Sequence, residues 1–405
     1  MSAFTPDSSF PCASGNESGI IPCLGFGTAT LRGDGAVAKI QAAIDEGYRM
    51  LDTALLYGNQ QEVGEAVKNS GIPREEFWIT SKVSFFPPAD NQIWMYNANN
   101  LVGEELASID LSLELLAMTY VDLCLIHNPW SVYCMCYSII ISIYIYCGHN
   151  PSSFLRNILC CTCNLSTSAA EYSLATLPHF FELFNVCGYD SAIKPDKLPD
   201  GTGMRDFIIE NKRKEIEVVD KKAAYESRKN SWLQMESALA LGKCKRIGVS
   251  NYTADLLLEL KEYANVMPAV NEIEFHPRFA SPELVALCRD LNVVLIGYGT
   301  GHYIAIEQAI KDKSSRNAMQ ILNSIVERVA KEGKKKSPLQ VVLRWMLQLG
   351  VVSIPRSGSA EHMKQNRDIF DFELSVAEMK LMDDLNEDYP YYWDPVPTNM
   401  TLVRR

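Results

Sequence analysis

The sequence lacks several features that mark common classes of protein. Its 38 lysine and arginine residues are outnumbered by 49 aspartate and glutamate residues, a net charge of −11, so no overall positive field attracts nucleic acid. The first ten residues, MSAFTPDSSF, show no charged segment followed by a sustained apolar one, so we expect no secretory signal and a cytoplasmic location. The most apolar stretch, 132–147, has 16 residues, whereas a membrane helix needs about 20. We therefore expect neither nucleic acid nor a membrane as a partner.

Two binding motifs are also missing. A Gly-x-Gly-x-x-Gly turn, the mark of the doubly wound nucleotide fold, would need a third glycine where Thr30 stands, and the glycines at 297, 299 and 301 have the wrong spacing. The Cys-Cys-Thr-Cys segment at 160–163 resembles no standard zinc site, and we expect no metal. Eight of the 12 cysteines crowd into 124–187, and the other four are scattered singly, as in a reduced protein that uses cysteine as a small hydrophobic residue.

Eight apolar segments rich in β-branched residues alternate with amphipathic segments along the chain. The predicted strands are 24–29, 49–53, 77–83, 121–126, 246–249, 269–275, 293–298 and 351–354. The predicted helices include 36–46, 61–69, 101–117, 231–241, 254–263, 282–290 and 338–349. Eight such strands, each followed by a helix, predict an α/β fold: a single (β/α)8 TIM barrel within 1–405, with a core at about 20–130 and 230–385.

A long irregular insertion follows the fourth predicted strand. Roughly 100 residues separate Trp130 from Trp232, where a short loop and a helix are expected. Residues 148–186 show no clear periodicity, and the composition of 131–187 is typical of translated non-coding sequence such as a retained intron, which we favour. The alternatives are a genuine insertion or hairpin over the barrel mouth, and a membrane anchor. At the other end, 386–405 form an aromatic and proline-rich C-terminal tail of a kind that can cover a barrel mouth.

Polar side chains stand where successive strands are predicted to end. Asp52 ends the second strand and Tyr57 lies in the loop after it, Lys82 ends the third strand, and His127 follows the fourth. Each of these residue types alone is more often structural, but catalytic groups of α/β barrels lie at these strand ends, so we expect all four to meet at one mouth. An ammonium beside a phenol favours its deprotonation, and a carboxylate keeps that ammonium charged. This set fits protonation of a carbonyl oxygen, and since no side chain donates hydride, a nicotinamide cofactor is implied.

The chain resembles the aldo-keto reductase family. Its motifs, in order, are GFGTA at 25–29, DxxxxYGNxxxVGxA at 52–66, ITSKV at 79–83, VDLCLIHNP at 121–129, RIGVSNY at 246–252, PAVNEIEFHP at 268–277 and SIPRSGSAEHMKQN at 353–366. The resemblance covers about 20–385, with part of 131–230 unmatched. It implies an NAD(P)H-dependent oxidoreductase that reduces aldehydes or ketones to alcohols. In that reaction Tyr57 donates the proton and Lys82 lowers its pKa, Asp52 pairs with Lys82, and His127 orients the carbonyl.

The resemblance also implies that NADPH lies extended across the barrel mouth. The residues expected at its nicotinamide end are Thr28, Ser250, Asn251, Glu272 and the stacking Tyr298. Those expected at the adenosine and its 2′-phosphate are Arg356, Ser357, His362, Gln365 and Asn366.

Three positions depart from the family pattern. Glu272 replaces the usual glutamine, and a carboxylate cannot donate a hydrogen bond. Arg356 replaces lysine and still favours a phosphate, whereas neutral His362 in place of arginine removes one fixed charge, so NADPH is expected over NADH by a smaller margin. Residues 299–302 replace the usual Ser-Pro-Leu-Gly run after Tyr298, so we expect a different loop at the pyrophosphate.

Two other functions remain compatible with these residues. The chain could be a cofactor-binding regulatory subunit of the same fold, although the complete set of Asp52, Tyr57, Lys82 and His127 argues against a loss of catalytic activity. It could also be an inactive product, because the insertion enters directly after His127 and beside the substrate pocket. The expected partner is a small carbonyl compound, and we favour a monomer. The identity of that carbonyl compound depends on the variable loops, and their sequences do not predict a substrate.

Overall fold

The structure, a computed structural model, describes residues 4–12, 19–33, 35–83, 104–129, 221–310 and 313–391. The chain divides into two compact units, and all of these residues except Lys221 belong to one of them. The predicted insertion at 131–187 and the end of the tail, 392–405, lie outside the described residues.

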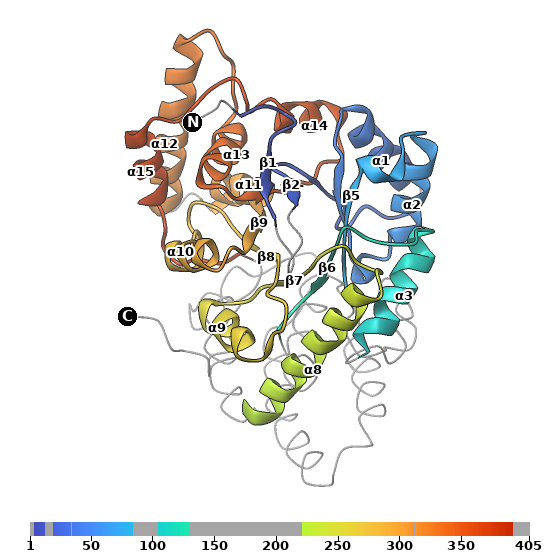
Figure 1. The fold of residues 1–405 in the computed structure, drawn as a ribbon. Helices are drawn as coiled ribbons and strands as arrows, with labels where there is room; N and C mark the ends of the chain where they lie inside the picture. The colour runs from blue at the N-terminus through green and yellow to red at the C-terminus, as the bar shows by residue number, and fades with distance from the viewer. Residues whose placement is uncertain are drawn as a thin grey trace, which may run out of the picture. The chain divides into compact units, whose positions relative to one another are not determined.

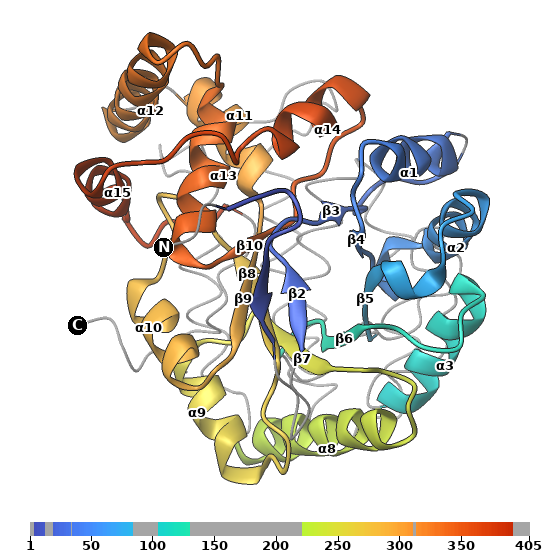
Figure 2. The same cartoon turned by 45° about the horizontal axis from the view of Figure 1, so that its top comes forward.

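A parallel sheet of eight strands forms the centre of this unit, and its strands are hydrogen-bonded in chain order. They are β3 (Phe26–Gly27), β4 (Met50–Asp52), β5 (Trp78–Lys82), β6 (Leu123–Ile126), β7 (Ile247–Ser250), β8 (Val270–Glu274), β9 (Val294–Tyr298) and β10 (Val352–Ser353). The first and last strands also meet, because the Gly25 N–H donates to the Ser353 carbonyl at 2.8 Å and the Ser353 N–H donates to the Cys23 carbonyl at 3.2 Å. The predicted (β/α)8 barrel is therefore confirmed, and Figure 2 shows the strands curling inside a ring of helices.

Helices cover the outside of the sheet (Figure 1). Those that the sequence predicts are α1 (Ala36–Asp45), α2 (Gln60–Asn69), α3 (Glu105–Leu116), α8 (Lys221–Ala240), α9 (Ala254–Tyr263), α10 (Pro282–Asp290) and α13 (Pro338–Leu349). The sequence signals are clearest in α13, where Ser337 and Gln340 form a capping box and Gly350 ends the helix in the left-handed conformation, with φ of 80°. The prediction for α8 was too short, because the helix begins at Lys221 rather than 231.

Several elements were not predicted. They are the antiparallel hairpin of β1 (Ser9–Pro11) and β2 (Ile20–Pro22), the 3-10 turns η1 (Leu55–Tyr57) and η2 (Arg74–Glu76), and the helices α11 (Thr300–Ile310), α12 (Lys313–Lys331), α14 (Ala360–Arg367) and α15 (Val376–Asp383). At 299–302, where we expected a different loop, helix α11 already begins at Thr300. This stretch has no proline, so nothing prevents its backbone N–H groups from entering a helix.

The β1–β2 hairpin packs against the beginnings of the strands. Cys12 and Ile21 from the hairpin join the apolar cluster whose other members include Met50, Trp78, Leu123, Val270 and Val352. This packing fills the amino-terminal end of the barrel and leaves the carboxyl ends of the strands for polar groups.

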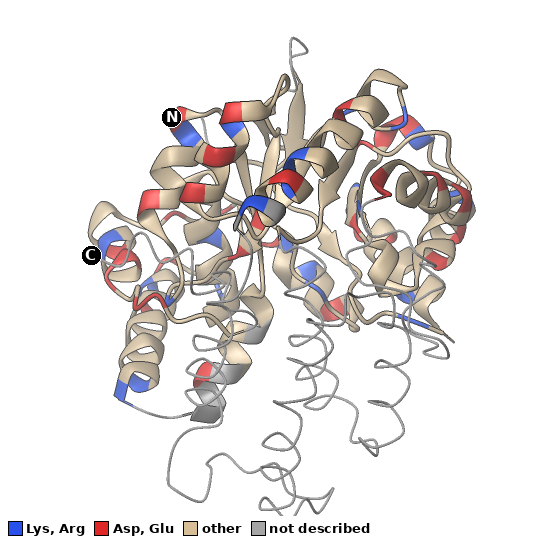
Figure 3. Ribbon diagram, turned by 90° about the horizontal axis from the view of Figure 1, so that it is seen from below, with Lys and Arg blue, Asp and Glu red and all other residues tan. Residues whose placement is uncertain are grey.

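Three further features concern the charged residues, the length of the helices and the cysteines. Acidic and basic residues are interspersed over the outer helices rather than gathered by sign (Figure 3). Among the described helices, none is both long and apolar enough to cross a membrane. The five described cysteines, Cys12, Cys23, Cys124, Cys244 and Cys288, are buried and free, as expected of small hydrophobic residues.

Candidate active site

The polar residues that the sequence places at strand ends lie at the carboxyl end of the barrel. Asp52, Lys82, Ser250 and Tyr298 are the last residues of β4, β5, β7 and β9, and His127 directly follows β6. Side chains alternate along a strand, so residues two apart share a face. Met50 and Trp78 belong to the apolar cluster inside the barrel, and the same alternation directs Asp52 and Lys82 inward.

The loop that carries Tyr57 is held in one shape by Asn59. The side-chain amide of this buried asparagine donates to the Thr28 carbonyl at 2.8 Å and to the Leu31 carbonyl at 3.0 Å. Its oxygen accepts from the Thr53 hydroxyl at 2.8 Å. Gly58 ends the short turn η1 with φ of 60°, a conformation that glycine adopts without strain. Tyr57 is thereby fixed beside the end of β4.

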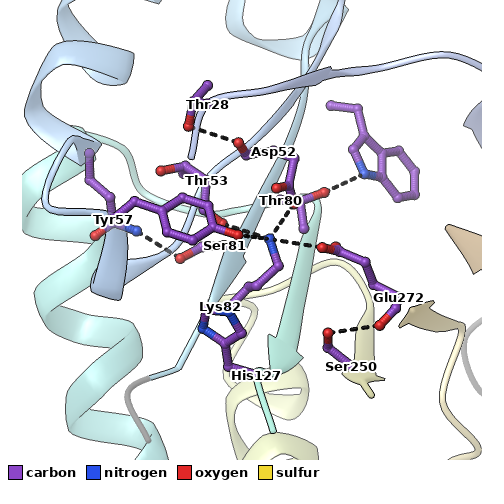
Figure 4. A network of polar contacts seen from close by, with 12 residues as sticks. Thr28, Asp52, Thr53, Tyr57, Thr80, Ser81, Lys82, His127, Ser250 and Glu272 are labelled. Carbon is purple, nitrogen blue, oxygen red and sulfur yellow. Dashed lines mark hydrogen bonds and ion pairs between the residues drawn. The ribbon is translucent and has the colours of Figure 1, made fainter. Parts of the chain in front are cut away.

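Lys82 is the centre of the site. Its Nζ lies 2.5 Å from Asp52 Oδ2 and donates to the Thr53 carbonyl at 3.2 Å and to the Tyr57 hydroxyl at 3.4 Å. The rings of Tyr57 and His127 meet edge to face with centroids 5.8 Å apart. Figure 4 shows the ammonium between Asp52 and Tyr57, with the imidazole nearby. The structure thus brings together the four residues that the sequence singled out.

Burial and charge set the protonation of this cluster. Burial lowers the pKa of Lys82, but Asp52 and then Glu272 outweigh it, so the net pKa is raised and the ammonium stays charged. Burial, followed by the charge of Lys82, holds the pKa of His127 well below its usual value, so the imidazole is neutral at pH 7. A neutral imidazole can donate one hydrogen bond to a substrate oxygen.

The pKa of Tyr57 differs from the sequence expectation. Burial raises it above the ordinary value, and Lys82 lowers it only in part, while Asp52 and Glu272 raise it further. Lys82 therefore lowers the pKa of Tyr57 as expected, but the net shift of that pKa is upward. The physical reason is that the phenol is buried, and burial destabilises the phenolate by more than one nearby ammonium stabilises it.

Glu272 takes a position that sequence reasoning did not predict. Its Oε1 lies 3.2 Å from Lys82 Nζ, so a residue expected at the nicotinamide also contacts Lys82 itself. The signal was present, because Glu272 is two residues after Val270, which faces the interior cluster. Burial and then the charge of Asp52 raise the pKa of Glu272 to about 8.

The other residues expected at the nicotinamide lie on the adjoining strand ends. Thr28 is buried and its hydroxyl donates to the Asp52 carbonyl at 2.8 Å. The Ser250 hydroxyl donates to the Glu272 carbonyl at 2.8 Å, and the Tyr298 hydroxyl donates to Asn251 Oδ1 at 2.7 Å. Asn251 in turn donates to the His127 carbonyl at 3.1 Å. These contacts link the expected cofactor residues to the cluster of Asp52, Tyr57, Lys82 and His127.

One polar atom in this region can accept a further partner. Glu272 Oε2 is buried and has no hydrogen-bond partner within the described part of the chain. A bound nicotinamide carboxamide, with an amide donor and a carbonyl acceptor, fits such an atom.

The residues expected at the adenosine form a separate group after β10. Arg356 is exposed and donates to the Thr30 hydroxyl, which joins the segments that follow β3 and β10. Ser357 is buried just before α14, and its hydroxyl accepts from the Ser359 N–H at 3.1 Å. The helix itself carries the remaining three residues, the exposed His362, the half-buried Gln365 and the buried Asn366.

One acidic residue of α14 lies within this group. Gln365 donates to the Glu361 carboxylate at 2.9 Å. Glu361 was not among the residues expected at the cofactor, although it directly precedes His362 in the last motif.

The comparisons with known proteins agree on one family. The model of the aldo/keto reductase family matches residues 23–387. Glyoxal reductase of Bacillus subtilis is 28% identical over 369 residues, which are 91% of this chain and 90% of that protein. A 9,11-endoperoxide prostaglandin H2 reductase of Trypanosoma cruzi is 25% identical over 390 residues, 95% of each chain.

Solved structures support the same fold. The aldo-keto reductase of Bombyx mori, in complex with NADP, has a TM-score of 0.59 and 21% identity over 95% of each chain. The aldose reductase of Schistosoma japonicum has a TM-score of 0.60 and 20% identity, and covers 95% of this chain and 94% of its own.

Proposed function

Because the chain belongs to the aldo/keto reductase family and is an NAD(P)H-dependent oxidoreductase, we propose that it reduces aldehydes or ketones to alcohols with NADPH. The observation that carries the proposal is the position of Lys82. Its ammonium contacts both the Asp52 carboxylate and the Tyr57 hydroxyl, which leaves the phenol as the group able to give a proton to a reacting oxygen.

Each residue of the cluster has one task in this reaction. A nicotinamide cofactor, when bound, supplies the hydride that the carbonyl carbon accepts. The neutral His127 donates a hydrogen bond to the carbonyl oxygen and holds it near Tyr57. As the oxygen gains negative charge, the Tyr57 hydroxyl gives it a proton, and Lys82 stabilises the phenolate that remains. Asp52 keeps Lys82 charged and fixed in direction.

The choice of NADPH rests on the group after β10. Arg356 supplies a guanidinium, which suits a phosphate, and it precedes the buried Ser357 and helix α14. The Bombyx mori relative was solved with NADP, which is consistent with this preference. Glu361 opposes it, since a carboxylate repels a phosphate.

Replacing Tyr57 by phenylalanine tests the proposal. The Tyr57→Phe variant should bind NADPH with nearly unchanged affinity and lose roughly 100- to 10,000-fold in turnover of aldehydes and ketones, the usual contribution of one general acid. The measurement is NADPH consumption at 340 nm over a panel of aldehydes, ketones and quinones, with binding followed by fluorescence.

Tyr120→Phe is the matched control, because Tyr120 lies before β6, at the opposite end of the barrel, where its ring packs against Arg74 and Lys245. This variant should keep the parent rate. If Tyr57→Phe reduced aldehydes as fast as the parent, Tyr57 would not be the proton donor.

A further inference from the structure

Lys82 faces two buried carboxyl groups, whereas the proposed reaction needs only one. Asp52 Oδ2 is 2.5 Å and Glu272 Oε1 is 3.2 Å from its Nζ, and each carboxyl side chain is only 3% exposed. The family that the sequence resembles usually has glutamine at 272, a side chain of nearly the same shape without a charge. The glutamate therefore adds one ionisable group at the centre of the site.

One ammonium cannot neutralise two buried carboxylates. Burial raises the pKa of Asp52, but Lys82 at the shorter distance opposes this shift. Burial and the charge of Asp52 together raise the pKa of Glu272 to about 8. Near neutral pH the pair of carboxyl groups thus holds one proton, and Glu272 carries it.

The groups around Glu272 come from six parts of the barrel. The residues that face it or lie next to it are Asp52 on β4, Lys82 on β5, Tyr57 on η1 and His127 after β6, with Ser250 on β7 and Ile296 on β9 in register with its backbone. Ser250 and Ile296 carry no charge, and His127 is neutral at pH 7 because burial and Lys82 lower its pKa. Among the described residues, an ionised Glu272 therefore acts on Tyr57 and Lys82 without another neighbour to compensate its charge, and that charge raises the pKa of Tyr57.

We propose that Glu272 is a positioning residue that shares one proton with Asp52, and that this proton controls how readily Tyr57 gives up its own. With the proton in place, one negative charge matches the charge of Lys82. When base removes the proton to solvent, a second negative charge lies beside Lys82 and Tyr57 holds its proton more tightly. The inference rests on the proposed function, since it takes Tyr57 as the acid.

The same proton also restores a hydrogen-bond donor. Glu272 Oε2 is buried without a hydrogen-bond partner among the described residues, and a proton on this carboxyl lets it donate as a glutamine amide would. Ionisation removes that donor. Cofactor affinity should therefore fall over the same pH range as the rate.

The test compares the parent with Glu272→Gln between pH 6 and 10, and each profile is normalised to its own maximum. In the parent, kcat should fall by up to tenfold per pH unit as the pH passes about 8 and level off once Glu272 is ionised, and the dissociation constant of NADP+ should rise over the same range. In Glu272→Gln both changes should begin at higher pH. The matched control is Glu105→Gln, because Glu105 is also a buried carboxyl but lies on α3, bonded to Ser231. Its profile should follow the parent.

Infrared spectroscopy gives a readout that needs no turnover. The parent minus Glu272→Gln difference spectrum should contain a protonated carboxyl band at pH 7 that disappears as the pH passes about 8. Identical pH profiles for parent and Glu272→Gln, or a missing band, would overturn the inference. Failure of the proposed function is a separate result, since it would appear as full turnover by Tyr57→Phe, while the infrared and binding profiles would still report on Glu272.

Discussion

Replacing Asp52 by asparagine should leave Lys82 with a substitute partner. In the parent at pH 7, Asp52 is the ionised carboxyl and Glu272 carries the shared proton. Without the charge of Asp52, the main electrostatic opposition to ionising Glu272 is gone, so Glu272 should lose its proton and pair with Lys82 at 3.2 Å. The double variant Asp52→Asn/Glu272→Gln removes both partners and leaves a buried ammonium alone.

The distances set the expected energies. With an effective dielectric constant of about 20, attraction between unit charges is about 7 kcal/mol at 2.5 Å and about 5 kcal/mol at 3.2 Å. Exchange of partners in Asp52→Asn should therefore lower the free energy of unfolding by about 1.5 kcal/mol. Glu272→Gln replaces a neutral group by a neutral group of similar shape and should cost less than about 1 kcal/mol. The double variant should cost roughly 3 to 5 kcal/mol, as expected for a buried charge without its partner.

Reversible urea unfolding at pH 7, followed by tryptophan fluorescence, measures all four proteins in one cycle. The loss in the double variant should exceed the sum of the single losses by about 2 kcal/mol, well beyond the usual deviation of about 0.5 kcal/mol for independent sites. Additive losses would refute the reasoning, since they would mean that Glu272 does not replace Asp52 as partner of Lys82.

Two further predictions concern the cofactor and the packing of the barrel. Arg356→Ala should raise the KM for NADPH at least tenfold and change that for NADH little, because a hydrogen bond to a charged group is typically stronger than about 1.5 kcal/mol. Steady-state kinetics with both cofactors measure these KM values, and Lys364→Ala, on the exposed side of α14, is the control. An equal rise of KM for both cofactors would contradict the phosphate contact. Gly64→Ala should destabilise the protein by roughly 2 kcal/mol, since a Cβ there would lie 2.2 Å from the Leu116 carbonyl oxygen. Urea unfolding measures this loss, and Gly301→Ala, whose Cβ meets nothing within 4 Å, should show no comparable one.

The barrel was predictable because its strands are buried on both faces. Seven of the eight predicted strands contain the observed one, as 77–83 contains β5, since continuous apolar runs mark parallel strands, and the eighth, 246–249, ends one residue before β7 does. The β1–β2 hairpin was missed because strands of three residues are too short to show a period. Helix α12 could have been found, since its buried residues Ala318, Leu322, Ile325 and Val329 repeat at three and four positions.

The sequence predicted which residues form the candidate site better than it predicted which of them contact one another. Position at strand ends and the order of motifs singled out Asp52, Tyr57, Lys82 and His127, and the structure brings these side chains together. The contact between Glu272 and Lys82 was not predicted, because β8 and β5 are not neighbours in the sheet and residue spacing does not give the distance across a barrel. The direction of the Tyr57 shift depended on depth of burial, which residue spacing does not reveal.

The raised pKa of Tyr57 suits a proton donor that must wait for its acceptor. Burial favours the neutral phenol, so the proton stays on Tyr57 while the carbonyl oxygen beside it is uncharged. Once that oxygen becomes negative it is a far stronger base than water, and the transfer then leaves a phenolate whose charge Lys82 matches at 3.4 Å. A second carboxylate near Lys82 weakens this match, because it takes part of the same positive charge. The protonation of Glu272 therefore decides whether the Lys82 ammonium stabilises mainly the Tyr57 phenolate or is shared between two carboxylates. The pH at which that change occurs is the most direct measure of how Glu272 controls the acidity of Tyr57.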